Sequence, residues 1–186
     1  MTATLPTQFR ELVEALDSPS KDNHDRAFAG LMKATELPVP WAYALWDDLL
    51  VTLREGDNRQ RSIAAQVLSN LAKSDPKRRM SKDFAALLRV TKDEHFVTAR
   101  HCLQSLWKVG VVGEPQRMAL LKGLVLRFEE CASEKNCTLI RYDILVALWR
   151  VYDLVSDEKI QVAAKRLMAM EEDPKYRKKY STVWRK

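Results

Sequence analysis

The stretch DNRQRSIAAQVLSNLAK, residues 57–73, carries the pattern that decides the fold. It begins with an acid that can cap a helix, and Arg61 follows four residues later. Apolar side chains stand three, seven and ten positions after the arginine, at Ala64, Leu68 and Leu71. This spacing places all three on one face of a helix. The stretch therefore predicts an amphipathic helix whose apolar face packs into a core.

The same arginine-led pattern recurs twice later in the chain. Arg100 lies 39 residues after Arg61, and Arg141 lies 41 residues after Arg100. With one exception, Gly110, the positions three, seven and ten residues beyond them are apolar: Leu103, Trp107 and Gly110, then Ile144, Leu148 and Val151. A period of about 40 residues predicts stacked helical repeats. An earlier arginine, Arg26, falls out of phase, as is expected in a terminal repeat.

Composition and helix-start signals extend this prediction to the whole chain. Apolar residues make up 46% and charged residues 30% of the chain, as in globular proteins, and five glycines with few alternating apolar runs disfavour an all-β fold. Asp75-Pro76 predicts the start of a helix that runs through Val90. We therefore expect an all-α, single-domain fold over residues 1–186, with about ten helices paired antiparallel in a right-handed α-solenoid.

The repeats resemble those of the HEAT class of helical-repeat proteins. The residues that carry the resemblance are the acids that precede second helices, Asp57 and Asp93, and the arginines Arg61, Arg100 and Arg141. The resemblance implies that acids and arginines of neighbouring repeats hydrogen-bond to each other, which makes the arginines structural. It also implies that the second helices line a concave face, where the partners of such proteins commonly bind.

The shared phase of the second helices indicates which side chains stand beside the core on that face. One position after each arginine are Ser62, His101 and Tyr142, and eight positions after each are Ser69, Lys108 and Trp149. We expect a partner-binding surface on the concave face, formed by His101, Lys108, Tyr142, Trp149 and Asp153. The alternative for Trp149 is burial, because an internal repeat helix contacts two neighbours.

The C-terminal segment, residues 173–186, is expected to form a basic capping helix. Residues 175–186 hold six lysines and arginines and no acid, so the rest of the +6 chain is neutral overall. The aromatic residues of this segment recur every four residues and share a helix face. They either pack against the preceding helix as a cap or stack on bases while lysines bind phosphates. In the second case, the nucleic-acid or anion contact consists of Lys175, Lys178, Lys179, Tyr180 and Trp184.

Three cysteines, Cys102, Cys131 and Cys137, suggest reduced thiols and a cytoplasmic location. The last two flank a polar turn and are either a redox pair or small apolar residues. The sequence contains no metal-ligand spacing, phosphate loop or nucleophile motif, so we expect no metal and no cofactor. We also expect no membrane contact, because no apolar run is long enough to cross a bilayer and the N-terminus does not resemble a signal peptide.

These features favour a non-catalytic scaffold that binds another protein through its concave face. The alternatives are nucleic-acid binding through the basic C-terminal helix and a DNA repair activity like that of the HEAT-like alkylpurine DNA glycosylases, which use a concave tryptophan and aspartate. Trp149 and Asp153 are similar to that pair, since they lie four residues apart on one helix face. The pair comes late in the chain, however, and residues 1–174 are net neutral, whereas duplex binding favours a basic face.

Overall fold

The computed structural model describes residues 3–184, so residues 1–2 and 185–186 of the expected domain and C-terminal helix lie outside the described part. No strand occurs within residues 3–184, and the helices Phe96–Ser105 and Trp107–Gly110 are separated only by Leu106. The prediction of an all-α fold with about ten helices is confirmed. The helices are α1 (Thr7–Ala15), α2 (Lys21–Ala34), α3 (Ala42–Glu55), α4 (Asn58–Leu71), α5 (Met80–Val90), α6 (Phe96–Ser105), α7 (Trp107–Gly110), α8 (Glu114–Glu130), α9 (Cys137–Val155), α10 (Glu158–Ala169) and α11 (Pro174–Val183), with short 3-10 turns at η1 (Ala72–Ser74) and η2 (Cys131–Ser133).

The helix that carries the decisive pattern, α4, begins where the sequence predicts. Asp57 and Gln60 form a capping box: the Asp57 carboxylate accepts a hydrogen bond from the Gln60 amide at 2.8 Å, and the Gln60 side chain accepts one from the Asp57 amide at 3.0 Å. Such a box satisfies two amides that the first turn leaves unpaired. Ala64, Leu68 and Leu71 are at most 1% exposed, so all three face the core as predicted.

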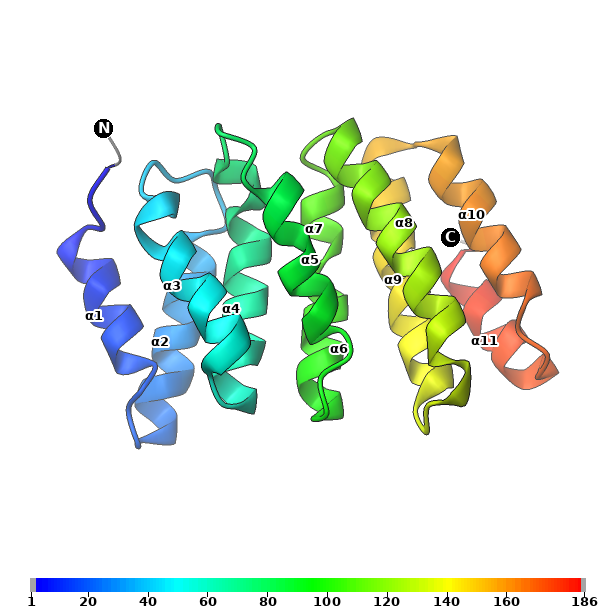
Figure 1. Cartoon of the computed structure of the whole chain (residues 1–186), viewed down its shortest axis with the longest axis horizontal. Coiled ribbons are helices and arrows are strands. Elements are labelled where there is room, and N and C mark those ends of the chain that lie inside the picture. Colours follow the sequence, from blue (N-terminus) through cyan, green and yellow to red (C-terminus); the bar gives the residue numbers. More distant parts are fainter. Residues whose placement is uncertain (1–2, 185–186) are drawn as a thin grey trace.

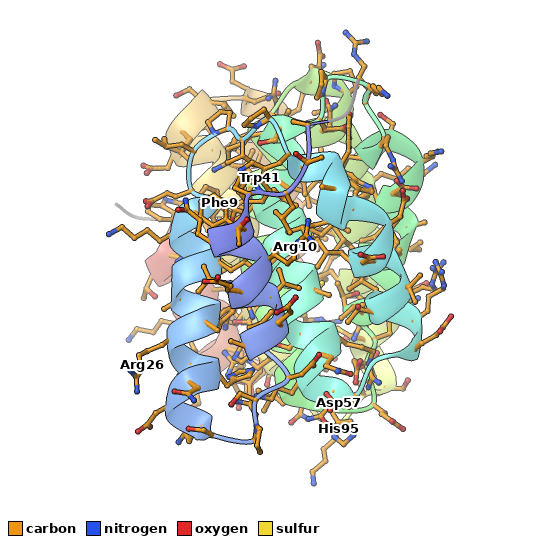
Figure 2. All side chains as sticks on the ribbon, turned by 90° about the vertical axis from the view of Figure 1, so that its left-hand side faces the viewer. Phe9, Arg10, Arg26, Trp41, Asp57 and His95 are labelled. Atoms are coloured by element: carbon orange, nitrogen blue, oxygen red, sulfur yellow. The ribbon has the colours of Figure 1, made fainter. Side chains whose placement is uncertain are left out.

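The helices lie side by side along the long axis in the order of the chain, and they form two layers (Figure 1). In one layer α3, α5, α8 and α10 follow one another, and in the other α2, α4, α6, α9 and α11 do so, each in contact with the next. At the N-terminal end α1 packs on α2, and Phe9 lies against Trp41 with ring centroids 4.8 Å apart (Figure 2). A continuous apolar core extends from Leu31 to Tyr180. This arrangement is compatible with a helical repeat.

Each of the three pattern arginines forms an ion pair with an acid that comes later in the chain. The shortest nitrogen–oxygen distances are 2.6 Å for Arg61–Asp93, 2.6 Å for Arg100–Asp143 and 3.1 Å for Arg141–Glu171. The acid–arginine contacts that the resemblance implies are therefore present, although only Asp93 is one of the expected turn acids. Arg26 instead donates to the Asp22 backbone carbonyl at 3.2 Å and points into solvent (Figure 2), which agrees with its position out of phase.

The Arg61–Asp93 pair predicts a pH dependence of stability. Burial raises the pKa of Asp93, but hydrogen bonds from the Arg61 guanidinium and the His95 amide lower it by more, so the pKa lies below its usual value. A carboxyl whose folded pKa lies below its unfolded value of about 3.9 adds stability that is present above the unfolded pKa. That stability is lost as the pH falls through the folded pKa.

We therefore expect Arg61→Ala to be less stable than the wild type in urea unfolding at neutral pH, and the difference to shrink as the pH falls below about 4. The matched control is Arg54→Ala, which removes an exposed arginine from the last turn of α3. A difference between Arg61→Ala and wild type that stays constant into the acid range would contradict the prediction.

Gly110 is the one departure from the apolar pattern, and the packing explains it. It ends α7, and a Cβ atom at this position would lie 2.5 Å from Leu120 Cδ2 and 3.0 Å from Val151 Cγ2. Leu120 on α8 and Val151 on α9 are fully buried. Because a close-packed core has little space for added atoms, a side chain at position 110 would force Leu120, Val151 or α7 itself to shift.

Candidate functional site

The residues that the sequence assigns to a concave face lie on the layer that contains α4, α6, α7 and α9. His101 is on α6, Lys108 is on α7, and the other three are on α9, which contacts both α6 and α7. The structure thus places them on neighbouring helices. His101 and Asp153 are exposed, whereas Lys108, Tyr142 and Trp149 are half-buried. The His101 ring is fixed by a hydrogen bond of 2.8 Å between its Nδ1 and the Ser62 hydroxyl.

Trp107, which the sequence places in the apolar core series, is half-buried and lies beside two cations. The Lys108 ammonium is 5.8 Å and the Arg150 guanidinium 5.5 Å from the centroid of a Trp107 ring. Both distances are within the range of a cation–π contact. The indole therefore holds positive charges from α7 and α9 close to each other.

Lys108 is held by a neutral group in a positively charged neighbourhood. Its ammonium donates a hydrogen bond to the side-chain oxygen of Asn70 on α4. Burial lowers the pKa of Lys108, and the charges of Lys73 and Arg150 lower it further, while Glu36 acts in the opposite direction. Lys73 itself donates to the Glu36 backbone carbonyl at 2.6 Å. An anion bound between these three cations would relieve their mutual repulsion.

A fourth cation lies on the last helix. The Lys179 ammonium is 4.7 Å from the centroid of the Tyr142 ring, and Tyr142 in turn packs on Tyr180 with centroids 6.5 Å apart. We call Lys73, Lys108, Arg150 and Lys179 the basic stripe; the charges of Lys73 and Arg150 act on Lys108, whereas Lys179 contacts α9 at Tyr142, about two turns before Arg150. Its members belong to η1, α7, α9 and α11, and they are placed by a backbone carbonyl, an amide and aromatic rings. Because these partners are neutral, the contacts that position the charges do not neutralise them, although the nearby Glu36 carboxylate partly offsets the charges of Lys73 and Lys108.

The last helix, α11, separates the predicted C-terminal contact residues into exposed and packed groups. Lys175, Lys178 and Lys179 are exposed. Tyr180 is fully buried, and its hydroxyl donates to the Thr138 carbonyl at 2.9 Å. Trp184 packs on Tyr152 with ring centroids 5.6 Å apart. The Tyr180 ring is therefore covered by the core, as in the capping alternative, and in this structure it is not accessible for stacking on a base.

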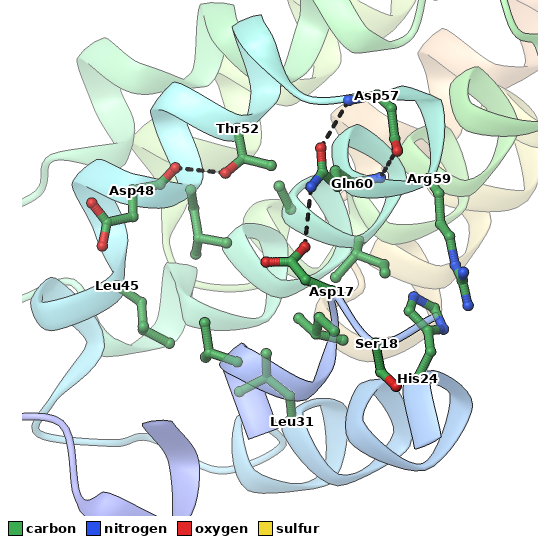
Figure 3. Close-up of a pocket in the computed structure, with 15 residues that line it drawn as sticks. Asp17, Ser18, His24, Leu31, Leu45, Asp48, Thr52, Asp57, Arg59 and Gln60 are labelled. Carbon is green, nitrogen blue, oxygen red and sulfur yellow. Dashed lines mark hydrogen bonds between the residues drawn. The ribbon is translucent and has the colours of Figure 1, made fainter. Parts of the chain in front are cut away.

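A separate pocket of about 520 Å³ lies between α1, α2, α3 and α4 (Figure 3). His24 lines this pocket and is only 5% exposed. The Nδ1 atom of His24 lies 3.1 Å from the Asp25 carboxylate. The Nε2 atom of His24 has no hydrogen-bond partner among residues 3–184. At the rim, Gln60 already engages both Asp17 and Asp57. Pockets of this size can bind small molecules, but none of the residues that the sequence predicts as a site lines this one.

The chain matches no protein-family model and no curated protein. The resemblance to HEAT repeats therefore depends on the arginine-led pattern and on the layered helices. In the described part of the chain, no three histidine, cysteine or acidic side chains are grouped so that they can hold a metal ion. Over the same residues, no helix combines the length and the apolar composition that a bilayer crossing requires.

Proposed function

We propose that the chain is a right-handed, HEAT-like solenoid of antiparallel helix pairs that serves as a non-catalytic scaffold, and that its basic stripe binds an acidic segment of a protein partner. The observation that carries the proposal is the placement of the four stripe cations by neutral and aromatic groups. Charges held in this way are available to carboxylates that approach from solvent, and such complementarity gives specificity and a fast association rate.

The surroundings of the stripe support a protein partner. Tyr142 and Trp149 lie on the same layer and are half-buried, which leaves part of each ring accessible. Tyrosine, tryptophan and arginine are the residue types that contribute most to binding between proteins. The stripe also draws on helices far apart in the chain, so an extended segment can contact several repeats at once, as in other helical-repeat proteins.

Nucleic-acid binding fits the same surface less well. Binding to nucleic acid depends on the neutralisation of several phosphates and, for single strands, on aromatic rings that stack with bases. The ring of Tyr180 is buried, so it does not offer a face to a base. Asp153 places an exposed carboxylate one turn from Arg150 on α9, where its negative charge disfavours a phosphate. That exposure also weakens the glycosylase alternative, because a carboxylate stabilises developing charge best in a site that excludes water.

Fluorescence anisotropy with a labelled poly-glutamate peptide tests the proposal. We expect binding that weakens as salt is added. The double variant Lys108→Gln/Arg150→Gln should weaken it by about tenfold, or about 1.4 kcal/mol, because two charge-assisted contacts are lost. The matched control is Lys165→Gln/Arg166→Gln, which removes the same charge from exposed positions on α10 and should leave the affinity unchanged.

If both double variants weaken peptide binding equally, the binding depends only on the net charge of the protein, and the assignment of the stripe as the binding site is overturned. Single-stranded and duplex DNA oligonucleotides are titrated in parallel. Tighter binding of either, with the same dependence on Lys108 and Arg150, would replace the protein partner with a nucleic acid. An absence of binding to the peptide and to both oligonucleotides at low salt would contradict both functions.

A further inference from the structure

The turn between α8 and α9 brings two of the three cysteines into contact. Cys131 begins η2 and Cys137 begins α9, and their sulfur atoms are 3.2 Å apart. A disulfide joins sulfur atoms about 2.05 Å apart, so closure needs an approach of about 1 Å. We propose that Cys131 and Cys137 form an oxidation site, at which a hydroperoxide converts the two thiols into one intramolecular disulfide that dithiol reductants reverse.

The turn is held in this shape by contacts that do not involve sulfur. The Glu134 amide donates to the Cys131 carbonyl at 2.9 Å, and the Cys137 amide donates to the Glu134 carbonyl at 3.0 Å. The Glu134 carboxylate accepts a hydrogen bond of 2.8 Å from Arg127, which is 2% exposed and also donates to the Thr91 carbonyl at 3.1 Å. Most of the chain entropy that opposes loop closure is therefore already lost in the reduced protein.

The two sulfur atoms differ in their access to an oxidant. Cys131 is fully buried, and burial together with the neighbouring Cys137 sulfur raises the pKa of its thiol, although the positive charges of Arg141 and Arg127 act in the opposite direction. Cys137 is half-buried at the start of α9. Because oxidation requires access to the sulfur, Cys137 is the thiol that meets the peroxide. Cys131, in contact with it, is the resolving thiol.

The reaction balances with hydrogen peroxide as the oxidant. The Cys137 sulfur attacks one peroxide oxygen, the O–O bond breaks, and the departing hydroxide takes the Cys137 proton to form water, which leaves a sulfenic acid. The Cys131 sulfur then attacks the Cys137 sulfur, the S–O bond breaks, and the second hydroxide leaves as water with the Cys131 proton. The two thiols lose two electrons in total, and the peroxide is reduced to two waters.

Cys102 provides an internal comparison within the same chain. It is fully buried on α6, and its thiol donates to the Leu87 carbonyl at 3.3 Å. Burial raises the pKa of the Cys102 thiol well above its usual value. Buried thiols are inert toward oxidants in solution, and Cys102, unlike Cys131, has no second cysteine in contact among the described residues, so Cys102 is expected to stay reduced while the other two react.

Thiol counting by mass spectrometry tests the proposal on the full chain. The reduced protein is exposed to hydrogen peroxide, quenched, denatured and alkylated. We expect the number of alkylated cysteines to fall from the three free thiols to one, with a monomer mass lower by about 2 Da before alkylation. Dithiothreitol should restore all three. Cys102→Ser should still form the disulfide, whereas Cys137→Ser should not.

Cys131→Ser is the second test, and its melting curve is recorded first because the residue is buried. If it folds, Cys137 should stop at the sulfenic or sulfinic stage, because its resolving partner is absent. Three outcomes would overturn the proposal: a wild type that keeps three alkylatable thiols, a disulfide that forms only between molecules, or oxidation that Cys137→Ser leaves unchanged.

Discussion

Arg100→Ala is expected to lower the free energy of unfolding by about 3 kcal/mol. In the wild type, Arg100 donates from Nε and from a terminal nitrogen to the two oxygens of Asp143, at 2.6 and 3.0 Å. The Asp143 side chain is only 3% exposed. After truncation its carboxylate keeps the neutral amide of Gln104 at 3.2 Å but no charged partner. A buried, uncompensated carboxylate is costly, and domains are stable by only about 5–15 kcal/mol.

Urea unfolding at neutral pH, followed by far-UV circular dichroism, measures this loss. Arg150→Ala is the matched control, because its guanidinium is exposed and, among residues 3–184, contacts the Trp107 ring without an ion pair; we expect it to cost less than about 1 kcal/mol. Arg100→Leu/Asp143→Leu removes both charges and should recover most of the loss, since apolar residues can replace a buried ion pair. If the double variant is as unstable as Arg100→Ala, the loss of stability comes from lost packing and not from an unpaired buried carboxylate.

The partners of the arginines show how far the sequence can predict this fold. The apolar phase after each arginine is a local property, so the positions of α4, α6 and α9 follow from spacing alone. Asp93 is also predictable, because an acid in the turn before a helix is a local signal. Asp143 is not predictable in this way. It stands two residues after Arg141 inside an apolar helix, and only the packing of α6 on α9 brings it to Arg100.

The start of α5 shows a local signal that a distant contact modifies. Asp75-Pro76 predicts a helix that begins at the proline, but α5 begins at Met80. Asp75 still acts as a cap, since its carboxylate accepts hydrogen bonds from the amides of Arg79 and Met80 at 2.8 and 2.7 Å. It also accepts one from the Tyr43 hydroxyl, and Arg78 takes a left-handed φ of 54°. The chain therefore makes one more turn before the helix starts.

The basic stripe is only partly predictable from the sequence. Lys108 follows from its position after Arg100, and Lys179 follows from the basic tail. The repeat phase does not indicate Arg150 and Lys73, because neither stands at a position that the pattern assigns to the concave face. A lysine or arginine elsewhere on a helix surface is expected to be solvated and to lack a partner. Trp107 occupies a position that predicts core. Its exposed fraction depends on which helices cover it, and this is a property of packing rather than of local pattern.

The last helix offers the second large effect: Tyr180→Ala should cost about 4 kcal/mol. The ring is fully buried, and its neighbours include Tyr142 on α9 and Tyr176, with centroids 6.5 and 6.4 Å away. Its hydroxyl also shares one donated proton between the Thr138 carbonyl at 2.9 Å and the Glu171 carboxylate at 3.1 Å. Truncation therefore leaves a cavity and removes a hydrogen bond from Glu171, which pairs with Arg141.

Urea unfolding and amide hydrogen exchange together decide whether α11 is a cap that the whole chain needs. Tyr180→Phe keeps the ring and should cost only about 1–2 kcal/mol, and Lys178→Ala, at an exposed position, should change stability by less than about 0.5 kcal/mol. If α11 is a cap, Tyr180→Ala speeds exchange in α9 as well as in α11, because the covered face of α9 becomes exposed. If exchange becomes faster only in α11 and the unfolding midpoint does not change, the other helices are stable without α11, and α11 is not a cap that the fold requires.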